Sequence, residues 1–132
     1  MDENQINDLS KKVIGAAIEV HKNLGPGLLE NAYEQCLCQE LYLQGIPFER
    51  QKFMPIDYKG CEVDCGYRLD IVVDNKIIVE LKSASSIAPI HEAQLMTYLK
   101  LSKLWLGLLI NFNVVSLKKG IKRVVCGYCD SD

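Results

Sequence analysis

The sequence predicts an α/β protein with a mixed central β-sheet flanked by helices, and three observations lead to this class. Two segments in the first third of the chain repeat apolar residues at steps of three and four, the spacing of an amphipathic helix. Short runs rich in β-branched residues occupy the middle and the end of the chain. A third helical segment follows Pro89. The length of 132 residues is that of one domain, residues 1–132.

The first two helices are expected at residues 7–24 and at about 28–43. Apolar residues recur at helical spacing in the first one: Val13, Ala16, Ala17, Val20 and Leu24. Asn7 or Ser10 can cap its start. The sequence Gly25-Pro26-Gly27 ends it, because proline and two glycines do not continue a helix. Gly45 closes the second helix.

The strands are expected on both sides of the third helix, which should span residues 90 to about 100. Residues 48–58 are predicted as the first strand, with Pro55 indicating an edge position or a bulge. Lys59-Gly60 is expected to be a turn, after which the chain continues into a hairpin of two apolar strands. After the third helix, residues 105–111 should form a buried strand and residues 123–126 an edge strand.

The apolar pattern also predicts the register of the hairpin, whose strands are Leu69–Val73 and Ile77–Leu81. A two-residue loop, Asp74-Asn75, would place Leu69 opposite Glu80 and mix apolar and charged side chains on both faces. A three-residue loop or a bulged turn, with Asn75 or Lys76 in the left-handed conformation, gathers the apolar residues on one face: Leu69, Ile71, Val73, Ile77, Val79 and Leu81. Because a shift of one residue reverses every side chain, the pattern favours the longer loop.

Three charged residues, Asp70, Glu80 and Lys82, interrupt these apolar strands, and such charges are costly unless they are paired or bound to a metal. In the favoured register Asp70 and Glu80 are cross-strand neighbours, with Cβ atoms about 4.5–5.5 Å apart. Mg²⁺ binds one or two carboxylates together with waters and phosphate, so an ion between them would remove their repulsion. A lysine beside the ion can hold the water that attacks a phosphodiester. The alternative is a salt-bridge cluster of the three residues on a half-exposed sheet face.

The order Asp70, then Glu80-Leu81-Lys82, resembles the motif of the PD-(D/E)XK nuclease superfamily, with Leu69 in place of the motif's proline. Two further motifs resemble the GxxExxY family within that superfamily. Residues 27–33, Gly-Leu-Leu-Glu-Asn-Ala-Tyr, match Gly-x-x-Glu-x-x-Tyr. Gln94 and Tyr98 match a Gln-x-x-x-Tyr pair that lies beside the metal site in that family and in the related RecB-like nucleases. The resemblance covers about residues 11–126.

The resemblance implies a restriction-endonuclease-like core that carries a metal site. Asp70, Glu80 and the carbonyl of Leu81 would hold Mg²⁺ or Mn²⁺. Glu30 lies in the first turn of the second helix, and it would complete the ligand shell directly or through water. The competing interpretation of Glu30 is a carboxylate that is stabilised by the helix N-terminus alone.

The resemblance also implies roles for three other side chains in the hydrolysis of nucleic acid. Lys82 would orient the attacking water, Gln94 would position a phosphate or Lys82, and Tyr98 would support that arrangement. The competing interpretation of Gln94 and Tyr98 is an ordinary amphipathic surface helix. The alternative function is a nuclease fold without useful turnover that acts as a binding or regulatory module in a larger assembly.

The composition bears on partners. A formal charge of −2 argues against a strong non-specific polyanion binder, although it allows a local basic patch. The best candidate for such a patch is a cluster near Gly120: Lys118, Lys119, Lys122 and Arg123. The resemblance implies nucleic acid as the partner, DNA more than RNA, and the small size of the chain suggests a homo-oligomer or a protein partner.

The N-terminus and the cysteines bear on the compartment. The chain begins with an acidic and polar segment, so we expect no signal peptide, and its longest apolar run is too short to span a membrane. A cytoplasmic protein is the simplest expectation, with its six cysteines as reduced thiols. The alternatives are disulfides or a metal site made by two cysteine pairs with zinc-like spacing: Cys61 and Cys65, Cys126 and Cys129.

Overall fold

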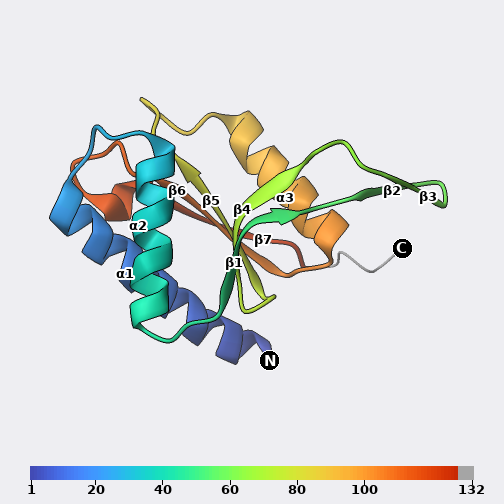
Figure 1. The fold of residues 1–132 in the computed structure, drawn as a ribbon, viewed down its shortest axis with the longest axis horizontal. Helices are drawn as coiled ribbons and strands as arrows, with labels where there is room; N and C mark the ends of the chain where they lie inside the picture. The colour runs from blue at the N-terminus through green and yellow to red at the C-terminus, as the bar shows by residue number, and fades with distance from the viewer. Residues whose placement is uncertain (128–132) are drawn as a thin grey trace.

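The computed structural model describes residues 1–127, in which the chain forms three α-helices, a short 3₁₀ helix and seven strands (Figure 1). The helices are α1 (Glu3–Leu24), α2 (Glu30–Leu43) and α3 (Pro89–Ser102), and the 3₁₀ helix is η1 (Leu117–Gly120). The strands are β1 (Phe48–Phe53), β2 (Ile56–Tyr58), β3 (Cys61–Val63), β4 (Arg68–Val73), β5 (Ile77–Lys82), β6 (Leu106–Asn111) and β7 (Ile121–Val125). The three helices and the strand pair after α3 follow the predicted order, but five strands rather than the predicted three lie between α2 and α3.

Five of the strands form one mixed sheet in the order β1-β4-β5-β6-β7. β5 and β6 are parallel, whereas the other neighbouring pairs are antiparallel. Parallel strands need a long crossover connection, and α3 provides it between β5 and β6. The hairpin of β4 and β5, which carries the charged residues, therefore lies inside the sheet rather than at its edge.

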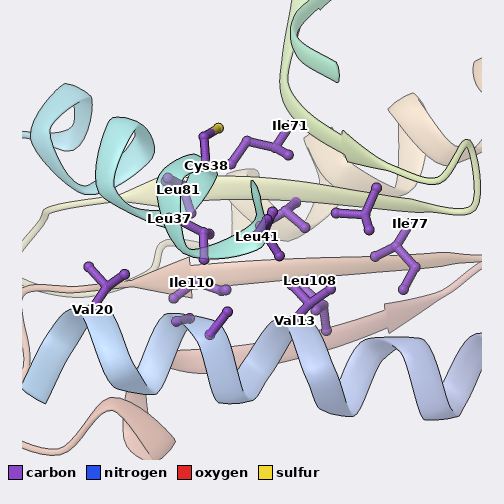
Figure 2. Close-up of a cluster of buried hydrophobic side chains, with 14 of the residues drawn as sticks. Val13, Val20, Leu37, Cys38, Leu41, Ile71, Ile77, Leu81, Leu108 and Ile110 are labelled. Carbon is purple, nitrogen blue, oxygen red and sulfur yellow. The ribbon is translucent and has the colours of Figure 1, made fainter. Parts of the chain in front are cut away.

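Helices cover both faces of this sheet, which confirms the expected mixed sheet flanked by helices. α1 and α2 pack on one face, where Val13, Leu37 and Leu41 meet apolar side chains of β5 and β6 (Figure 2). α3 covers the other face through Leu95 and Leu99, which are almost completely buried. The two apolar clusters hold the central strands from both sides.

The first helix begins four residues earlier than predicted, and neither Asn7 nor Ser10 is its cap. The cap is Asp2, whose carboxylate accepts a hydrogen bond from the Gln5 N–H at 2.8 Å. The side chain of Gln5 in turn accepts a hydrogen bond from the Asp2 N–H at 2.8 Å. This reciprocal capping box satisfies two backbone donors at once, which favours the earlier start.

The predicted single strand at residues 48–58 is wrong, because the chain divides it at Met54-Pro55 into β1 and β2. Proline has no N–H to donate to a strand ladder. β2 pairs with β3 in a separate two-stranded sheet, and Figure 1 shows this hairpin projecting away from the main sheet. The expected turn at Lys59-Gly60 is confirmed, with positive φ angles of 52° and 84°.

The predicted register of the central hairpin is confirmed, because Val73 pairs with Ile77 and Ile71 pairs with Val79. The Lys76 N–H donates to the Val73 carbonyl at 2.9 Å, so Asp74 and Asn75 form a tight turn and Lys76 is the extra residue. Asp74 and Asn75 both have positive φ, 51° and 52°, whereas Lys76 does not. The left-handed conformation therefore falls on Asn75, one of the two predicted positions, and also on Asp74.

Leu69 departs from the predicted face. It belongs to the apolar cluster under α3, together with Val72 and Ile78, whereas Ile71 faces α1 and α2. The alternation of side chains along β4 is thus broken between Leu69 and Ile71, at Asp70. The prediction that all six apolar residues share one face is wrong for Leu69.

Four of the cysteines are free thiols, as expected: Cys36, Cys38, Cys61 and Cys65. Cys126 is disulfide-bonded, so the expectation of six thiols is wrong at that position. Cys129 lies outside the described residues, and so does part of the alternative four-cysteine metal site. Among residues 1–127, no helix has the length and the apolar character needed to cross a membrane.

Candidate active site

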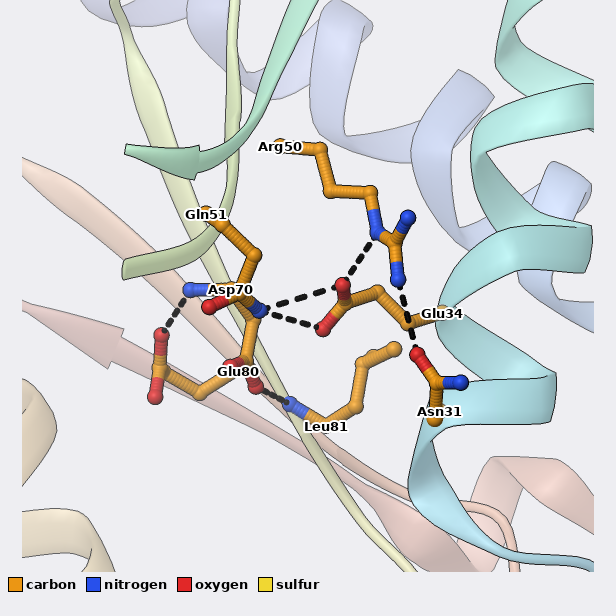
Figure 3. Close-up of polar contacts among 7 residues, drawn as sticks. All are labelled: Asn31, Glu34, Arg50, Gln51, Asp70, Glu80 and Leu81. Carbon is orange, nitrogen blue, oxygen red and sulfur yellow. Dashed lines mark hydrogen bonds and ion pairs between the residues drawn. The ribbon is translucent and has the colours of Figure 1, made fainter. Parts of the chain in front are cut away.

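β4 and β5 separate at Asp70 and Glu80, and the side chains of these two residues take over from the backbone pairing. Paired residues of the two strands end at Ile71 and Val79. Just beyond them, the Asp70 N–H donates to Glu80 Oε2 at 2.9 Å, and the Leu81 N–H donates to Asp70 Oδ2 at 2.9 Å (Figure 3). Each carboxylate is therefore fixed to the backbone of the opposite strand.

Each of these carboxylates also keeps one oxygen for another partner. Asp70 Oδ1 and Glu80 Oε1 take part in no hydrogen bond within residues 1–127. In the same part of the chain, no buried side-chain oxygen or nitrogen lacks a partner, so both oxygens must be accessible to solvent. The result is a pair of oriented, accessible carboxylate oxygens on two adjacent strands.

Burial raises the pKa of both carboxyl groups, and repulsion by neighbouring acids adds to the effect. Loss of hydration and, to a smaller extent, the charge of Asp70 raise the pKa of Glu80 to about 8. Burial is also the main cause of the raised pKa of Asp70, which the hydrogen bond from Leu81 opposes. A positive charge beside the pair would favour the ionised form of both groups. The site is therefore electrostatically suited to a cation.

Leu81 and Lys82 lie next to these carboxylates on β5. In a strand, the N–H and C=O of one residue point to the same side, so the Leu81 carbonyl faces β4 as its N–H does. The Lys82 carbonyl faces the other way and accepts a hydrogen bond from the Phe112 N–H at 2.9 Å. The half-buried Lys82 lowers the pKa of both Asp70 and Glu80, and none of the salt bridges within residues 1–127 involves it.

A third carboxylate, Glu34 of α2, is buried near Asp70, but it is occupied by partners of its own. Arg50 Nε forms an ion pair with Glu34 Oε2, and Gln51 Nε2 donates to both Glu34 oxygens at 2.9 and 3.1 Å (Figure 3). Arg50 Nη2 also donates to Asn31 Oδ1 at 2.7 Å. Glu34 raises the pKa of Asp70, which shows that the two carboxylates are electrostatically close.

Gln51 has an unusual backbone in the strand that faces Asp70. Its φ angle is 54°, although residues 48–53 form a strand. It lies between Arg50, which pairs with Ile71, and Lys52, which pairs with Leu69, so it is across from Asp70. A left-handed residue inside a strand is strained and persists only where its surroundings hold it. The hydrogen bonds to Glu34 supply such a hold.

Glu30 lies at the start of α2, but it does not join the two carboxylates. Its side chain is exposed and forms no hydrogen bond within residues 1–127. Its charge raises the pKa of Asp70 less than the charge of Glu34 does. The structure therefore places Glu30 near the site without bringing it into contact.

Gln94 and Tyr98 lie on α3, on the opposite face of the sheet from α2. They are exposed and half-buried, respectively, and line a common pocket with Tyr67. Burial and then the charges of Glu80 and Asp70 raise the pKa of Tyr98, so its hydroxyl is electrostatically close to the carboxylates. The Gln94 side chain forms no hydrogen bond with Lys82 or with another residue of the described chain.

Two loops hold the end of β5 in place. The Tyr33 hydroxyl donates to the Gly25 carbonyl at 2.6 Å and accepts from the Leu28 N–H at 3.0 Å. The Ser83 hydroxyl, directly after Lys82, donates to the Leu28 carbonyl at 2.6 Å. On the other side, the Asn111 side chain accepts from the Ala84 N–H at 3.1 Å and donates to the Ala84 carbonyl at 2.9 Å.

A family model described as the PD-(D/E)XK nuclease superfamily matches residues 7–124. The chain belongs to this superfamily. No curated protein and no solved structure matches it significantly. Nucleases of the superfamily generally depend on divalent metal ions.

The PD-(D/E)XK chain offers a small set of donors for such an ion. Within residues 1–127, no three His, Cys, Asp or Glu side chains lie together in an arrangement that could hold a metal. Two accessible carboxylate oxygens and a carbonyl that faces them nevertheless fit Mg²⁺, which usually takes one or two carboxylates and retains several waters. The donor chemistry thus fits a divalent ion that is held partly by water and substrate.

Sequence reasoning missed Glu34, Arg50 and Gln51 in this PD-(D/E)XK domain. A signal for Glu34 was present, because it lies on the buried stripe of α2 with Leu37 and Leu41, at helical spacing. An acidic residue on that stripe must have a partner. The identity of the partners depended on β1, whose side chains reach α2 only after the sheet has formed.

Proposed function

We propose that this protein is a metal-dependent nuclease that hydrolyses phosphodiester bonds of nucleic acid at Asp70, Glu80 and Lys82. The observation that carries the proposal is the crosswise hydrogen bonding of the two carboxylates, which leaves one accessible oxygen on each. Membership of a nuclease superfamily supports the same chemistry. A salt-bridge cluster, the competing interpretation, would need Lys82 bonded to a carboxylate, and no such bridge is among those of residues 1–127.

Asp70 Oδ1, Glu80 Oε1 and the Leu81 carbonyl would hold Mg²⁺ or Mn²⁺, and Glu30 would act through a bridging water. When bound, the ion supplies a Lewis acid for charge that develops on the phosphoryl oxygens. Lys82 orients the attacking water and balances the charge of the carboxylates. On α3, Tyr98 supports the arrangement from the opposite side of the sheet, and Gln94 positions the substrate.

We favour DNA over RNA as the substrate and place the chain in the GxxExxY group of the superfamily. Residues 27–33 support the grouping, because Tyr33 fixes the loop from Gly25 to Leu28 and that loop binds Ser83 next to Lys82. The motif thus has a structural purpose, which is to hold the end of β5. A homo-oligomer or a protein partner would add substrate-binding surface to a small chain of charge −2.

The second candidate is a nuclease fold that binds nucleic acid or regulates an assembly without useful turnover. The occupied Glu34 and the exposed Glu30 favour it, since neither of these acids joins Asp70 and Glu80. Cleavage of nucleic acid distinguishes the two candidates. A binding module does not hydrolyse the phosphodiester and therefore does not need Lys82 to orient a water.

The test is cleavage of single- and double-stranded DNA and RNA in millimolar Mn²⁺ or in EDTA. Asp70→Ala and Lys82→Ala should each lose about 10²-fold or more in rate, as expected when a group that stabilises the transition state is removed. Asp8→Ala and Lys11→Ala remove the same charges from exposed positions of α1 and should retain the wild-type rate. Equal activity in Asp70→Ala and wild type would point to a contaminant and leave the binding module.

A further inference from the structure

A pocket of about 230 Å³ lies between α3 and the root of the β2–β3 hairpin. Its walls include two tyrosines, Tyr67 and Tyr98, together with Gln94 of α3 and an apolar surface from Met54 and Leu101. Met54 is 4% exposed and marks the floor, whereas Tyr67 is 44% exposed and marks the rim. We call it the Tyr67–Tyr98 pocket.

The lining of this pocket combines flat apolar surface with a polar edge. The rings of Tyr67 and Tyr98 lie 6.3 Å apart between centroids and are tilted by 57°. Tyr67 is nearly half exposed, so part of this residue remains accessible from solvent. Gln94 adds both a donor and an acceptor, one helical turn from Tyr98. A flat heterocycle with hydrogen-bonding edges has the complementary chemistry.

The pocket adjoins the candidate active site. Tyr67 stands directly before β4, three residues ahead of Asp70, and its carbonyl accepts a hydrogen bond from the Met54 N–H at 3.1 Å. Tyr98 is close enough to Glu80 and Asp70 for their charges to raise its pKa. A polymer with its phosphate at the carboxylates can therefore reach the pocket with a neighbouring unit.

The charge beside the pocket favours a base over a phosphate. The hairpin that forms one wall carries three exposed acids, Asp57, Glu62 and Asp64, against one exposed lysine, Lys59. Arg68, which follows Tyr67, is exposed too, but its guanidinium lies over the Phe53 ring, 4.8 Å from the ring centroid. Such a surface repels a phosphate backbone, whereas a neutral ring that stacks on tyrosine is unaffected.

We propose that the Tyr67–Tyr98 pocket binds an unpaired nucleobase adjacent to the phosphate at Asp70 and Glu80, so the substrate is single-stranded or locally unpaired nucleic acid. This inference rests on the proposed function. A paired base is stacked on both faces and must leave the helix before it can enter a side pocket. Stacking on an aromatic side chain tolerates any base, so the pocket selects strand state rather than sequence.

The test measures binding of single-stranded DNA of about 12 nucleotides. Fluorescence anisotropy in EDTA avoids cleavage, and a 2-aminopurine in the strand reports stacking. Tyr67→Ala should weaken binding about tenfold or more and remove the quenching of 2-aminopurine, since stacking contributes at that level for each base. Tyr67→Phe keeps the ring and should bind as the wild type does. Tyr58→Ala removes an exposed tyrosine from the same hairpin but not from the pocket, and should have no effect.

Kinetics separate this inference from the proposed function. Tyr67→Ala should raise KM for single strands with a smaller change in kcat, whereas Asp70→Ala abolishes kcat. If Tyr67→Ala leaves KM and Kd unchanged while Asp70→Ala is inactive, the proposed base binding in the Tyr67–Tyr98 pocket is wrong. The proposed nuclease activity would stand. Normal single-strand binding by wild type together with unchanged cleavage in Asp70→Ala would overturn the nuclease instead. Preference for a fully paired duplex, or for an apolar peptide over DNA, would also overturn the pocket.

Discussion

Glu80 shares its site with Asp70, and the two acids can be ionised together only at a cost. Burial and the charge of Asp70 raise the pKa of Glu80 from an ordinary value of 4.5 to about 8. Between these two pH values the unfolded chain has lost the Glu80 proton and the folded chain has kept it. Folding therefore takes up a proton in this window, and rising pH opposes it.

We predict that the free energy of unfolding of the metal-free protein falls as pH rises from about 4.5 to about 8. The loss should reach at most about 1.4 kcal/mol per pH unit for this one group. Glu80→Gln cannot titrate, so its stability should change less over the same window. Urea unfolding in EDTA at several pH values measures both proteins. A wild-type profile parallel to that of Glu80→Gln would show that the pKa of Glu80 is ordinary.

Glu34 and Glu30 lie one turn apart on α2 and have opposite surroundings. Glu34 is 6% exposed and binds Arg50 and Gln51, whereas the Glu30 side chain is exposed and has no hydrogen bond in the described chain. Glu34→Ala should lower the free energy of unfolding by roughly 1–3 kcal/mol, because it leaves two donors without their charged acceptor. Glu30→Ala should stay within about 0.5 kcal/mol of wild type.

Urea unfolding in EDTA compares these two variants without interference from a bound ion. Equal losses would show that Arg50 and Gln51 find other partners. The same two variants distinguish a role in stability from a role in catalysis. If Glu30 acts through a water at the metal, Glu30→Ala should lower activity without lowering the free energy of unfolding.

At the scale of elements, the sequence predicts the central hairpin better than the strand beside it. The apolar alternation from Ile71 to Val79 determines the register, because only one pairing buries those residues together. The alternation carries no information about Leu69, because the Asp70 side chain takes the place of backbone pairing there. The apolar alternation also does not predict the left-handed backbone of Gln51. That conformation is held by hydrogen bonds to Glu34 of α2, which lies 17 residues earlier in the chain.

Three glycines show how closely the elements approach one another. A Cβ atom on Gly120 would lie 2.1 Å from the Asn111 carbonyl oxygen, and one on Gly107 would lie 2.8 Å from the nearest atom of the Leu95 side chain. Gly15, in the middle of α1, has nothing within 4 Å of that position. A Cβ on Gly120 would thus meet backbone, and one on Gly107 would meet a side chain that can shift. A Cβ on Gly15 would meet no atom.

We predict that alanine at these three positions changes stability in a graded order. Gly120→Ala should be the most destabilising, because the backbone next to the Asn111 and Ala84 contacts must move. Gly107→Ala should cost about 1–3 kcal/mol from overpacking against α3. Gly15→Ala should instead stabilise the protein by roughly 0.5–1 kcal/mol, since alanine is the better helix former. Denaturant unfolding ranks the three, and a tolerated Gly120→Ala would contradict the close approach of η1 to β6.

The whole molecule holds a buried acid, Glu80, and a half-buried acid, Asp70, on adjacent strands inside its sheet, an arrangement that favours function over stability. The apolar clusters on both faces supply the folding free energy, and the hydrogen bonds between Asp70, Glu80 and the opposite strands fix the geometry. A divalent ion that binds only the folded state stabilises it by about 2.7 kcal/mol at a hundredfold excess over Kd. For a domain of this size, the melting temperature should rise on the order of 5–10 °C.

We predict that millimolar Mn²⁺ raises the melting temperature of the wild type by this amount. Asp70→Ala should lose most of the increase. Without metal, Asp70→Ala should melt at or above the wild-type temperature, because it removes a like charge from beside Glu80. Lys82→Ala should keep or increase the Mn²⁺ shift, because it removes a positive charge from the site while both carboxylates remain. Thermal melts of the three proteins with Mn²⁺ and with EDTA measure these differences. The absence of any Mn²⁺ shift in wild type, even with nucleic acid present, would mean that Asp70 and Glu80 are not ligands, and the binding module would then explain the fold.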